Sequence, residues 1–325
     1  MSENSKFLEV KNLSVEYVSR KEIVKAVNDV SFSLERGKTL GLVGETGAGK
    51  TSIARAILRV LPAPMSRIAN GEINLDGVNV LELPEKEMCK LRGDHITMIF
   101  QDPMTSLNPV MRVGEQIAEV VQLHSEVSKA EAKKRAVEML EMVGIPEERY
   151  EEYPHQFSGG MKQRIVIAIA LACNPDLLLA DEPTTALDVT IQAQVLDLMR
   201  KLNEVQNTAM ILITHDLGVV AEMCDEVAVI YGGEIVESGT KEDLFDHPSH
   251  PYTLGLFGAL PSLETDVDWL SPISGLPPDP TDLPAGCYFS PRCPHATDAC
   301  REAHPELTNL SGSHLCRCMM VREEA

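Results

Sequence analysis

Eight consecutive residues near the start of the chain fit the phosphate-binding pattern G-x-x-x-x-G-K-[ST]. They are Gly44, Glu45, Thr46, Gly47, Ala48, Gly49, Lys50 and Thr51. Glycines let the backbone bend closely, so that successive N–H groups and a helix N-terminus can face phosphate oxygens. A lysine at this place supplies a positive charge for the β- and γ-phosphates, and a threonine hydroxyl can ligate Mg²⁺. The segment therefore predicts a nucleotide-phosphate site.

The residues on either side of this loop have the pattern that such a site requires. An apolar run at 40–43 comes before it, and a helical pattern at 52–58 follows. A strand, a glycine-rich loop and a helix in that order are the context in which the motif binds phosphate. The alternative is an accidental glycine-rich turn, which would require neither the strand before it nor the helix after it.

Two carboxylates end a second apolar run. Residues 177–180 are Leu-Leu-Leu-Ala, and Asp181 and Glu182 follow directly. A strand of a parallel sheet delivers the residues at its carboxyl end to the ligand crevice. We expect Asp181 to hold the Mg²⁺ shell and Glu182 to orient or deprotonate the attacking water. An acidic pair at a helix start is the simpler alternative.

Three consecutive residues open an apolar helix predicted over 165–173. Ser158 is a good N-cap, and Gly159 and Gly160 would expose N–H groups to an anion. Capping alone would explain the serine, but it does not explain two glycines in the first turn of a buried helix. We expect these three residues to contact a nucleotide.

Two further polar residues end predicted strands. Gln101 follows the strand 96–100, where its amide could reach a metal-bound or attacking water, so it is also a candidate near Mg²⁺. His215 follows the strand 210–214 and could contact the γ-phosphate. Taken alone, a glutamine is more commonly a surface residue and a histidine a structural one.

Hydrophobic periodicity predicts alternating strands and helices around these motifs. Short apolar runs such as 177–179 and 210–214 are typical of buried parallel strands. The expected elements are antiparallel strands within 7–43, strands near 71–77 and at 96–100, amphipathic helices at 113–124 and 129–143, a helix at 189–206, and a hairpin over 227–237 that turns at Gly232-Gly233. The fold class indicated is α/β.

Composition excludes several classes of protein. The length of 325 residues indicates one large or two smaller units. A net charge of −20 argues against a nucleic-acid partner held through its phosphates. The longest apolar run, 165–173, is far below the ~20 residues of a membrane span, and the first residues carry no apolar signal region. We expect a cytosolic protein, which is compatible with docking on a membrane protein.

The last part of the chain is rich in cysteine. Prolines between 272 and 284 predict an extended, stiff segment, and five thiols follow it, at Cys287, Cys293, Cys300, Cys316 and Cys318. Thiolates at this density select an iron–sulfur cluster or Zn²⁺. Structural zinc usually shows paired C-x2–4-C knuckles, so the wide spacings here favour a [4Fe–4S] cluster, with zinc and unliganded thiols as alternatives. Its expected role is to order the segment rather than to sense redox state.

In this order and spacing, the motifs resemble those of the ATP-binding cassette ATPases of ABC transporters. The resemblance makes residues 44–51 Walker A, Gln101 the Q-loop, 158–160 the signature, Asp181-Glu182 the end of Walker B, 186–188 the D-loop and His215 the switch histidine. It also makes Tyr17 the aromatic residue that stacks on adenine. It implies a P-loop NTPase (RecA-like) core with an antiparallel β-subdomain and a helical signature subdomain over about 103–173, all within 1–250. The signature departs from the usual L-S-G-G-Q, since Met161 replaces the glutamine.

A narrower resemblance links the chain to the ATPase subunits of oligopeptide and dipeptide importers. It rests on the His-Pro-Ser-His-Pro-Tyr-Thr segment at 247–253, on the signature, and on the tail around 286–294. It implies ATP hydrolysis that drives peptide import at the cytoplasmic face of a membrane. The implied partners are a second ATPase subunit, two membrane permease subunits and an extracytoplasmic peptide-binding protein.

The same resemblance extends to the small cysteine-rich extension, 251–325. It implies a [4Fe–4S] cluster on four of the five thiols, namely Cys287, Cys293, Cys300 and Cys318. Cys318 aligns best with the last ligand of the family, and Cys316 replaces an apolar residue.

Other classes remain as alternatives. A soluble ABC mechanoenzyme of DNA repair or chromosome structure would carry a long coiled coil between Walker A and the signature, and this span contains only short predicted helices. An importer of nickel or another small solute, or an exporter, would share all of the ATP chemistry.

Overall fold

The structure is a computed structural model that describes residues 6–184, 187, 189–258 and 273–321. By internal contacts the chain divides into two compact units. The first comprises Met1–Phe7, Leu34–Thr39 and Asn79–Ile213, and the second comprises Leu8–Ser33, Leu40–Val78 and Thr214–Ala325. The two units are described separately.

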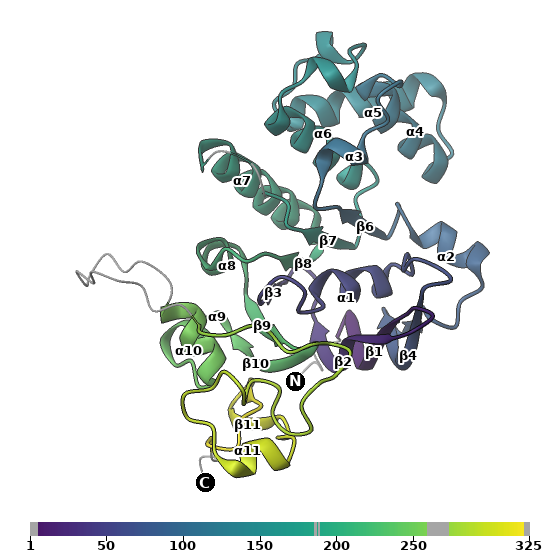
Figure 1. Cartoon of the computed structure of the whole chain (residues 1–325). Helices are drawn as coiled ribbons and strands as arrows, with labels where there is room; N and C mark the ends of the chain where they lie inside the picture. The colour runs from purple at the N-terminus through teal and green to yellow at the C-terminus, as the bar shows by residue number, and fades with distance from the viewer. Residues whose placement is uncertain (1–5, 185–186, 188, 259–272, 322–325) are drawn as a thin grey trace, which may run out of the picture. The chain divides into compact units, whose positions relative to one another are not determined.

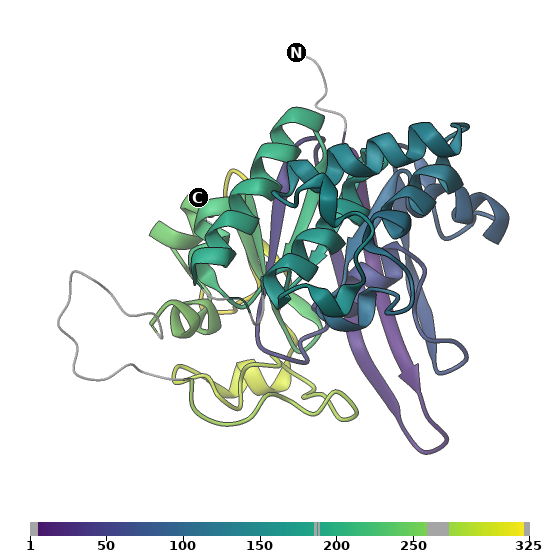
Figure 2. The same cartoon turned by 90° about the horizontal axis from the view of Figure 1, so that it is seen from above.

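The second unit begins with an antiparallel sheet in the strand order β2-β1-β4-β5. Its strands are β1 (Leu8–Val18), β2 (Ile23–Leu34), β4 (Ser66–Leu75) and β5 (Val78–Asn79). The view in Figure 2 shows β1 and β2 as long strands side by side. The antiparallel strands predicted within 7–43 are confirmed. The strand predicted near 71–77 begins earlier, at Ser66, and ends at Leu75, because Asp76 and Gly77 turn the chain with positive φ angles of 48° and 81°.

A second set of strands in this unit has the order β11-β12-β10-β9-β3. It comprises β3 (Thr39–Val43), β9 (Glu226–Tyr231), β10 (Glu234–Thr240), β11 (Thr308–Ser311) and β12 (His314–Cys316). β3 is fully buried and runs parallel to β9, and β9 and β10 form the predicted hairpin at Gly232-Gly233. β11 and β12 were not predicted. They extend the sheet beyond β10, so the end of the chain is part of this unit's fold.

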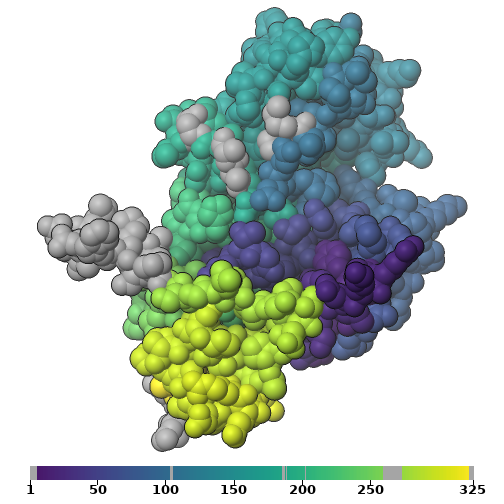
Figure 3. Space-filling model, viewed as in Figure 1, coloured from purple at the N-terminus to yellow at the C-terminus, as the bar shows by residue number. Residues whose placement is uncertain are grey.

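Five helices are found among the described residues of the second unit. They are α1 (Lys50–Ile57), α8 (Leu217–Met223), α9 (Lys241–Asp246), α10 (Pro251–Gly258) and α11 (Asp298–Glu302). α1 follows the phosphate loop directly, as predicted. In Figure 3 the residues after 273 form a compact surface next to the residues of α9 and α10. The described part of the proline-rich segment, 273–284, contains no helix or strand, and Pro272 lies outside the described residues.

The first unit contains three fully buried parallel strands in the order β8-β7-β6. They are β6 (Ile96–Ile99), β7 (Leu177–Asp181) and β8 (Ala209–Ile213). α2 (Glu85–Leu91) precedes β6, α3 (Pro103–Ser106) follows it, and α7 (Val189–Gln206) lies between β7 and β8. The predicted parallel strands and the helix 189–206 are confirmed. α2 was missed.

Three longer helices of the first unit lie together in Figure 1. They are α4 (Val113–His124), α5 (Lys129–Met142) and α6 (Gly159–Leu171), with the short turns η1 (Glu147–Arg149) and η2 (Pro154–Gln156) between the last two. The helix whose apolar part was predicted over 165–173 ends at Leu171. The prediction that Ser158 caps it and that both glycines lie in its first turn is confirmed. Among the described residues, we find no helix with the length and hydropathy of a membrane span.

Candidate functional site

The phosphate loop joins β3 to α1 and needs glycine at two of its positions. Gly44 has φ 155°, and a Cβ there would lie 2.1 Å from the carbonyl oxygen of Ile230. Gly49 has φ 103°, and its Cβ would lie 2.2 Å from the carbonyl oxygen of Ala26. Any side chain at these positions would collide with backbone, so the loop path depends on both glycines. The predicted loop is thus held between the backbone of Ala26 in β2 and that of Ile230 in β9.

Lys50 opens α1 and is turned back into the loop. Lys50 is only 7% exposed, and its Nζ donates to the carbonyl oxygens of Gly44 at 2.7 Å and Glu45 at 2.9 Å. The ammonium group therefore lies over the concave side of the loop, where a phosphate would be bound. Thr51 follows in the first turn of α1, the position predicted for an Mg²⁺ ligand.

The aromatic residue predicted to face adenine lies close to the same helix. Tyr17, at the end of β1, shares a hydrogen bond of 3.0 Å between its hydroxyl and Oγ of Ser52. Tyr17 is half-buried. The second unit thus brings the predicted adenine contact to the first turn of the helix that follows the phosphate loop.

The carboxylate predicted to be catalytic and the amide of Gln101 meet in the first unit. Gln101 Nε2 donates to Oε2 of Glu182 at 2.8 Å, although the two residues are 81 positions apart. Glu182 has φ 46°, a left-handed conformation that a non-glycine residue adopts only where its surroundings hold it, and its N–H donates to the carbonyl oxygen of Ile213 at 2.8 Å. Asp181 ends β7 and is 2% exposed. The carboxylate pair therefore emerges at the carboxyl end of a buried strand, as predicted.

The signature residues form the N-terminus of α6. Ser158 caps it, accepting the N–H of Met161 on Oγ at 3.4 Å. The surroundings of the two glycines differ. A Cβ on Gly160 would lie 2.7 Å from Ile191 of α7, whereas a Cβ on Gly159 would meet no atom within 4 Å. Packing therefore explains Gly160, while Gly159 leaves the helix N-terminus open on that side.

Met161 stands where the family signature has glutamine, and it has a local partner. Arg149 donates from Nη1 to its sulfur at 3.2 Å and also places its guanidinium 4.1 Å from the ring centre of Phe157. The departure from the usual signature is therefore accommodated by a contact between η1 and the start of α6.

His215 is an exposed residue between β8 and α8. The next residue, Asp216, caps α8 by accepting the N–H groups of Gly218 at 2.9 Å and Val219 at 3.3 Å. The cap anchors the chain immediately after the histidine. Of the predicted D-loop, Ala186 and Asp188 lie outside the described residues.

The candidate residues thus form two groups, one in each unit. Gln101, the signature and the carboxylate pair belong to the first unit, and the phosphate loop, Tyr17 and His215 belong to the second. Within the first unit, the hydrogen bond between Gln101 and Glu182 connects two motifs. Within the second, Tyr17 is hydrogen-bonded to Ser52 in α1, the helix that follows the phosphate loop.

Four of the tail cysteines line one small cavity of about 20 Å³. They are Cys287, Cys293, Cys300 and Cys318, the four predicted to hold a cluster, and His250 and Phe289 line the cavity with them. Cys316 is not among the lining residues. It is fully buried in β12, opposite Glu237 of β10, and burial raises the pKa of its thiol. Yet no group of three or more His, Cys, Asp or Glu side chains in the described parts of the chain is already arranged to hold a metal ion.

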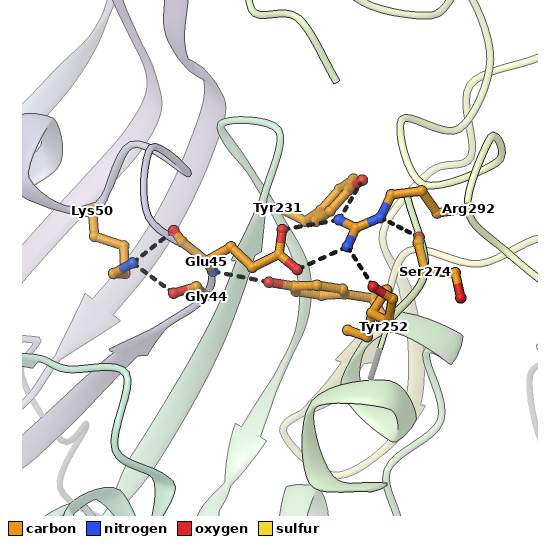
Figure 4. A network of polar contacts seen from close by, with 8 residues as sticks. Gly44, Glu45, Lys50, Tyr231, Tyr252, Ser274 and Arg292 are labelled. Atoms are coloured by element: carbon orange, nitrogen blue, oxygen red, sulfur yellow. Dashed lines mark hydrogen bonds and ion pairs between the residues drawn. The ribbon is translucent and has the colours of Figure 1, made fainter. Parts of the chain in front are cut away.

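Sequence reasoning missed a set of residues from the C-terminal region that hold the phosphate loop. Arg292 forms an ion pair with Glu45, and the hydroxyl of Tyr252 accepts the N–H of Glu45 (Figure 4). Both residues lie in segments that the sequence singled out, at 286–294 and 247–253. Nothing in the sequence could pair them with a residue more than 200 positions away.

Comparison with known proteins finds two matching family models and a similar solved structure. A model of the ABC transporter family matches residues 27–185, and a model of the oligopeptide/dipeptide transporter C-terminal region matches residues 236–300. The chain is 29% identical to the ATP-binding cassette MJ0796, whose dimeric structure was solved in a post-hydrolysis state bound to ADP and Pi. That match has a TM-score of 0.65 and covers 72% of this chain and 98% of the other.

Curated relatives match over almost the whole chain. The oligopeptide transport ATP-binding protein AppD of Bacillus subtilis is 49% identical over 98% of each chain. The oligopeptide transport ATP-binding protein OppD of Escherichia coli is 51% identical over 98% of this chain and 94% of its own. The dipeptide transport ATP-binding protein DppD of Bacillus subtilis is 48% identical over 98% of this chain and 96% of its own.

Proposed function

Because this chain belongs to the ATP-binding subunits of ABC transporters, in the group of oligopeptide and dipeptide transport proteins, we propose that it hydrolyses ATP to energise the import of di- and oligopeptides. The observation that carries this proposal is the identity of about half of all positions to three such proteins, over a length that includes the tail. We place the protein at the cytoplasmic face of the cell membrane. An importer of nickel or another small solute is the second candidate, and an exporter is less well supported.

The phosphate loop is the proposed site for ATP. The backbone N–H groups of residues 44–51 would face the phosphates together with the N-terminus of α1. Nζ of Lys50 donates to two carbonyl oxygens of the loop. On ATP binding, oxygens of the β- and γ-phosphates would replace these carbonyl oxygens as its acceptors. Tyr17 would stack on adenine. Mg²⁺, held by Thr51 and Asp181 with Gln101 near it, would neutralise charge that develops on the phosphates.

Glu182 is proposed as the residue that polarises the attacking water. Its carboxylate accepts a hydrogen bond of 2.8 Å from the amide of Gln101, and a carboxylate can act as a general base towards water. The backbone of Glu182 is fixed in a left-handed conformation at the end of β7, so the side chain starts from a defined position. His215 would contact the γ-phosphate. These assignments follow the motif positions of the family.

A complete site is proposed to need two ATPase subunits. The phosphate loop of one subunit would bind the phosphates from one side, and Ser158, Gly159 and Gly160 of a second subunit would bind them from the other. The open N-terminus of α6 at Gly159 supports a role in contacting an anion. Two membrane permease subunits and an extracytoplasmic peptide-binding protein complete the proposed complex. We assign 1–250 to the ATPase domain, with its helical part over about 103–173, and 251–325 to the extension.

A [4Fe–4S] cluster on the tail is part of the proposal. The four thiols that line one cavity, those of Cys287, Cys293, Cys300 and Cys318, suit such a group because thiolates are its usual ligands. The burial of Cys316 in β12 favours Cys318 as the fourth ligand. Bound there, the cluster would tie together a segment with few apolar residues and so order it.

Reconstitution of the whole transporter tests the proposed function. The chain, its second ATPase subunit, both permease subunits and the binding protein are placed in liposomes, and uptake of labelled di- and oligopeptides is measured with ATP on the ATPase side. We expect peptide uptake, with ATP hydrolysis that rises when the peptide-loaded binding protein is added. Uptake of Ni²⁺ in place of peptide would favour the second candidate. Full hydrolysis by the isolated chain, independent of its concentration, would contradict the two-subunit site.

A further inference from the structure

Glu45 of the phosphate loop is held by an arginine of the cysteine-bearing tail. The guanidinium of Arg292 donates two parallel hydrogen bonds to the Glu45 carboxylate, from Nη1 at 2.9 Å and from Nη2 at 3.0 Å. Figure 4 shows Glu45 between Lys50 and Arg292, with its carboxylate turned to the guanidinium. Paired hydrogen bonds of this kind fix direction as well as distance, which a lysine could not do.

Arg292 is itself rigidly held. Its side chain is only 5% exposed, and its remaining donors reach the carbonyl oxygens of Ser274 at 3.0 Å and Ile273 at 3.3 Å. Nη1 also donates to the hydroxyl of Tyr231 at 3.2 Å. A buried cation whose donors are all used has one position available to it, so the carboxylate that it binds is fixed too.

The backbone of Glu45 has a second attachment from the same region. Its N–H donates at 2.9 Å to the hydroxyl of Tyr252, a fully buried residue at the start of α10. The ring of Tyr252 packs against those of Tyr231 and Phe289, with centroids 4.5 Å and 5.4 Å apart. The loop residue is therefore held through both its main chain and its side chain.

The same loop residue holds the phosphate-binding lysine. Nζ of Lys50 donates to the carbonyl oxygens of Gly44 and Glu45. A continuous set of hydrogen bonds therefore runs from Arg292 through Glu45 to Lys50, all within the second unit. A shift of Glu45 would displace both the carbonyl oxygen that Lys50 contacts and the N–H groups that follow it in the loop.

We propose that Arg292 is a positioning residue for ATP binding, acting through Glu45 on the shape of the phosphate loop. The proposal rests on the assignment of that loop to ATP. Arg292 directly precedes Cys293, so the order of the tail and the affinity of the loop for nucleotide are coupled. Coupling between two sites is reciprocal, so bound ATP stabilises the tail by the same factor by which the tail strengthens ATP binding.

The first test compares Arg292→Met, Arg292→Lys and the control Arg301→Met in the full-length chain. Arg301 lies in the same tail and pairs with Asp298, but that pair is exposed, with side chains 57% and 93% accessible. We expect the dissociation constant of Mg-ATP, measured by calorimetry, to rise about 10-fold in both Arg292 variants and to stay unchanged in the control. In the assembled complex KM for ATP should rise while kcat changes little, because the arginine does not touch the reacting groups.

The second test approaches the same contact from the loop. Glu45→Gln keeps the loop length and the backbone contact to Tyr252 but removes the charge, so it should weaken ATP binding by a similar factor. In the double variant Glu45→Gln/Arg292→Met the two effects should not add, since both remove one interaction. Iron content and the melting temperature report whether the tail remains folded in each variant.

The third test measures the reciprocal effect. Hydrogen exchange of residues 287–293 should slow when Mg-ATP is added to the parent chain, and the slowing should be lost in Arg292→Met. Equal ATP affinity of the parent, Glu45→Gln and Arg292→Met, or exchange in the tail that does not respond to ATP, would overturn the proposal. If the parent chain itself does not bind ATP, the proposed function fails instead.

Discussion

The amide of Gln101 donates to the carboxylate of Glu182 across 2.8 Å, from the end of β6 to the end of β7. The contact joins the residue expected near Mg²⁺ with the residue proposed to polarise the attacking water. Because one carboxylate oxygen is occupied by Gln101, the orientation of the other oxygen is defined before nucleotide arrives.

Replacement of Glu182 by glutamine should stop hydrolysis and leave ATP binding intact. The amide is similar in size to the carboxylate but cannot accept a proton, and loss of a general base typically costs about 10²–10⁴-fold in rate. The measurement is the turnover of Mg-ATP by the assembled complex, with binding followed in parallel. The expected state is a closed pair of ATPase subunits with ATP trapped. Hydrolysis close to the parent rate would show that Glu182 is not the base.

Replacement of Lys50 by alanine should act on binding instead. The ammonium group would be lost from the phosphates, and a hydrogen bond to a charged group is worth about 1.5–3 kcal/mol, so ATP affinity should fall roughly 10- to 150-fold. Calorimetric titration with Mg-ATP checks this. Lys21→Ala is a suitable control, because Lys21 is an exposed residue in the turn between β1 and β2. Unchanged affinity in Lys50→Ala would remove the loop from the proposed site.

Replacement of tail cysteines should separate the two candidates for the fourth cluster ligand. We expect anaerobically purified protein to carry near-stoichiometric iron and sulfide and little zinc. Cys293→Ser and Cys318→Ser should lose the iron, because both residues line the shared cavity. Cys316→Ser should keep it, since that thiol is buried in β12. Retention of iron in Cys318→Ser with loss in Cys316→Ser would reverse the assignment, and one equivalent of zinc without iron would refute the cluster.

The attachment of the tail to β10 should weaken as the pH rises. The hydrogen bond to the buried carboxylate of Glu234, at 2.8 Å, raises the pKa of His304 above its ordinary value of 6.5. When the folded-state pKa of a histidine is raised, its favourable contribution to the free energy of unfolding is fully present below the unfolded-state pKa. The contribution is lost as the pH rises through the folded-state pKa. Hydrogen exchange of residues 304–316 should therefore speed up above about pH 6.5 beyond the intrinsic effect of pH.

His304→Gln should flatten this dependence, because glutamine does not titrate in the range. The exposed tail residue His295 provides the matched control, and His295→Gln should leave the slope unchanged. A slope that survives His304→Gln would assign the pH dependence to another group.

Local pattern predicted the elements that carry the chemistry. β7, β8 and α7 were found because apolar runs bounded by polar residues are a local property, and the carboxylates come directly after one of these runs. The start of α6 could be predicted because Ser158 is a good N-cap, and this cap offsets the weak helix propensity of the two glycines that follow it. β11 and β12 were missed because they are only four and three residues long and four of their seven side chains are polar.

Other features of the site are set by tertiary contacts that no local pattern contains. The left-handed backbone of Glu182 is held by Ile213 of β8, whose carbonyl oxygen accepts the N–H of Glu182. The ion pair of Glu45 with Arg292 joins positions 247 apart. Each residue could be picked out as unusual in its own motif, but the pairing could be found only in three dimensions.

The same separation has a consequence for how the protein is made. Ribosomes add about 5–20 residues per second, so Arg292 is synthesised roughly 12–50 s after Glu45, the residue that it will bind 247 positions earlier. During that interval the phosphate loop has left the ribosome, yet the ion pair cannot form. A translation product that stops before residue 292 carries the whole nucleotide motif but lacks this contact. The last step in shaping the loop therefore waits until Arg292 has been synthesised.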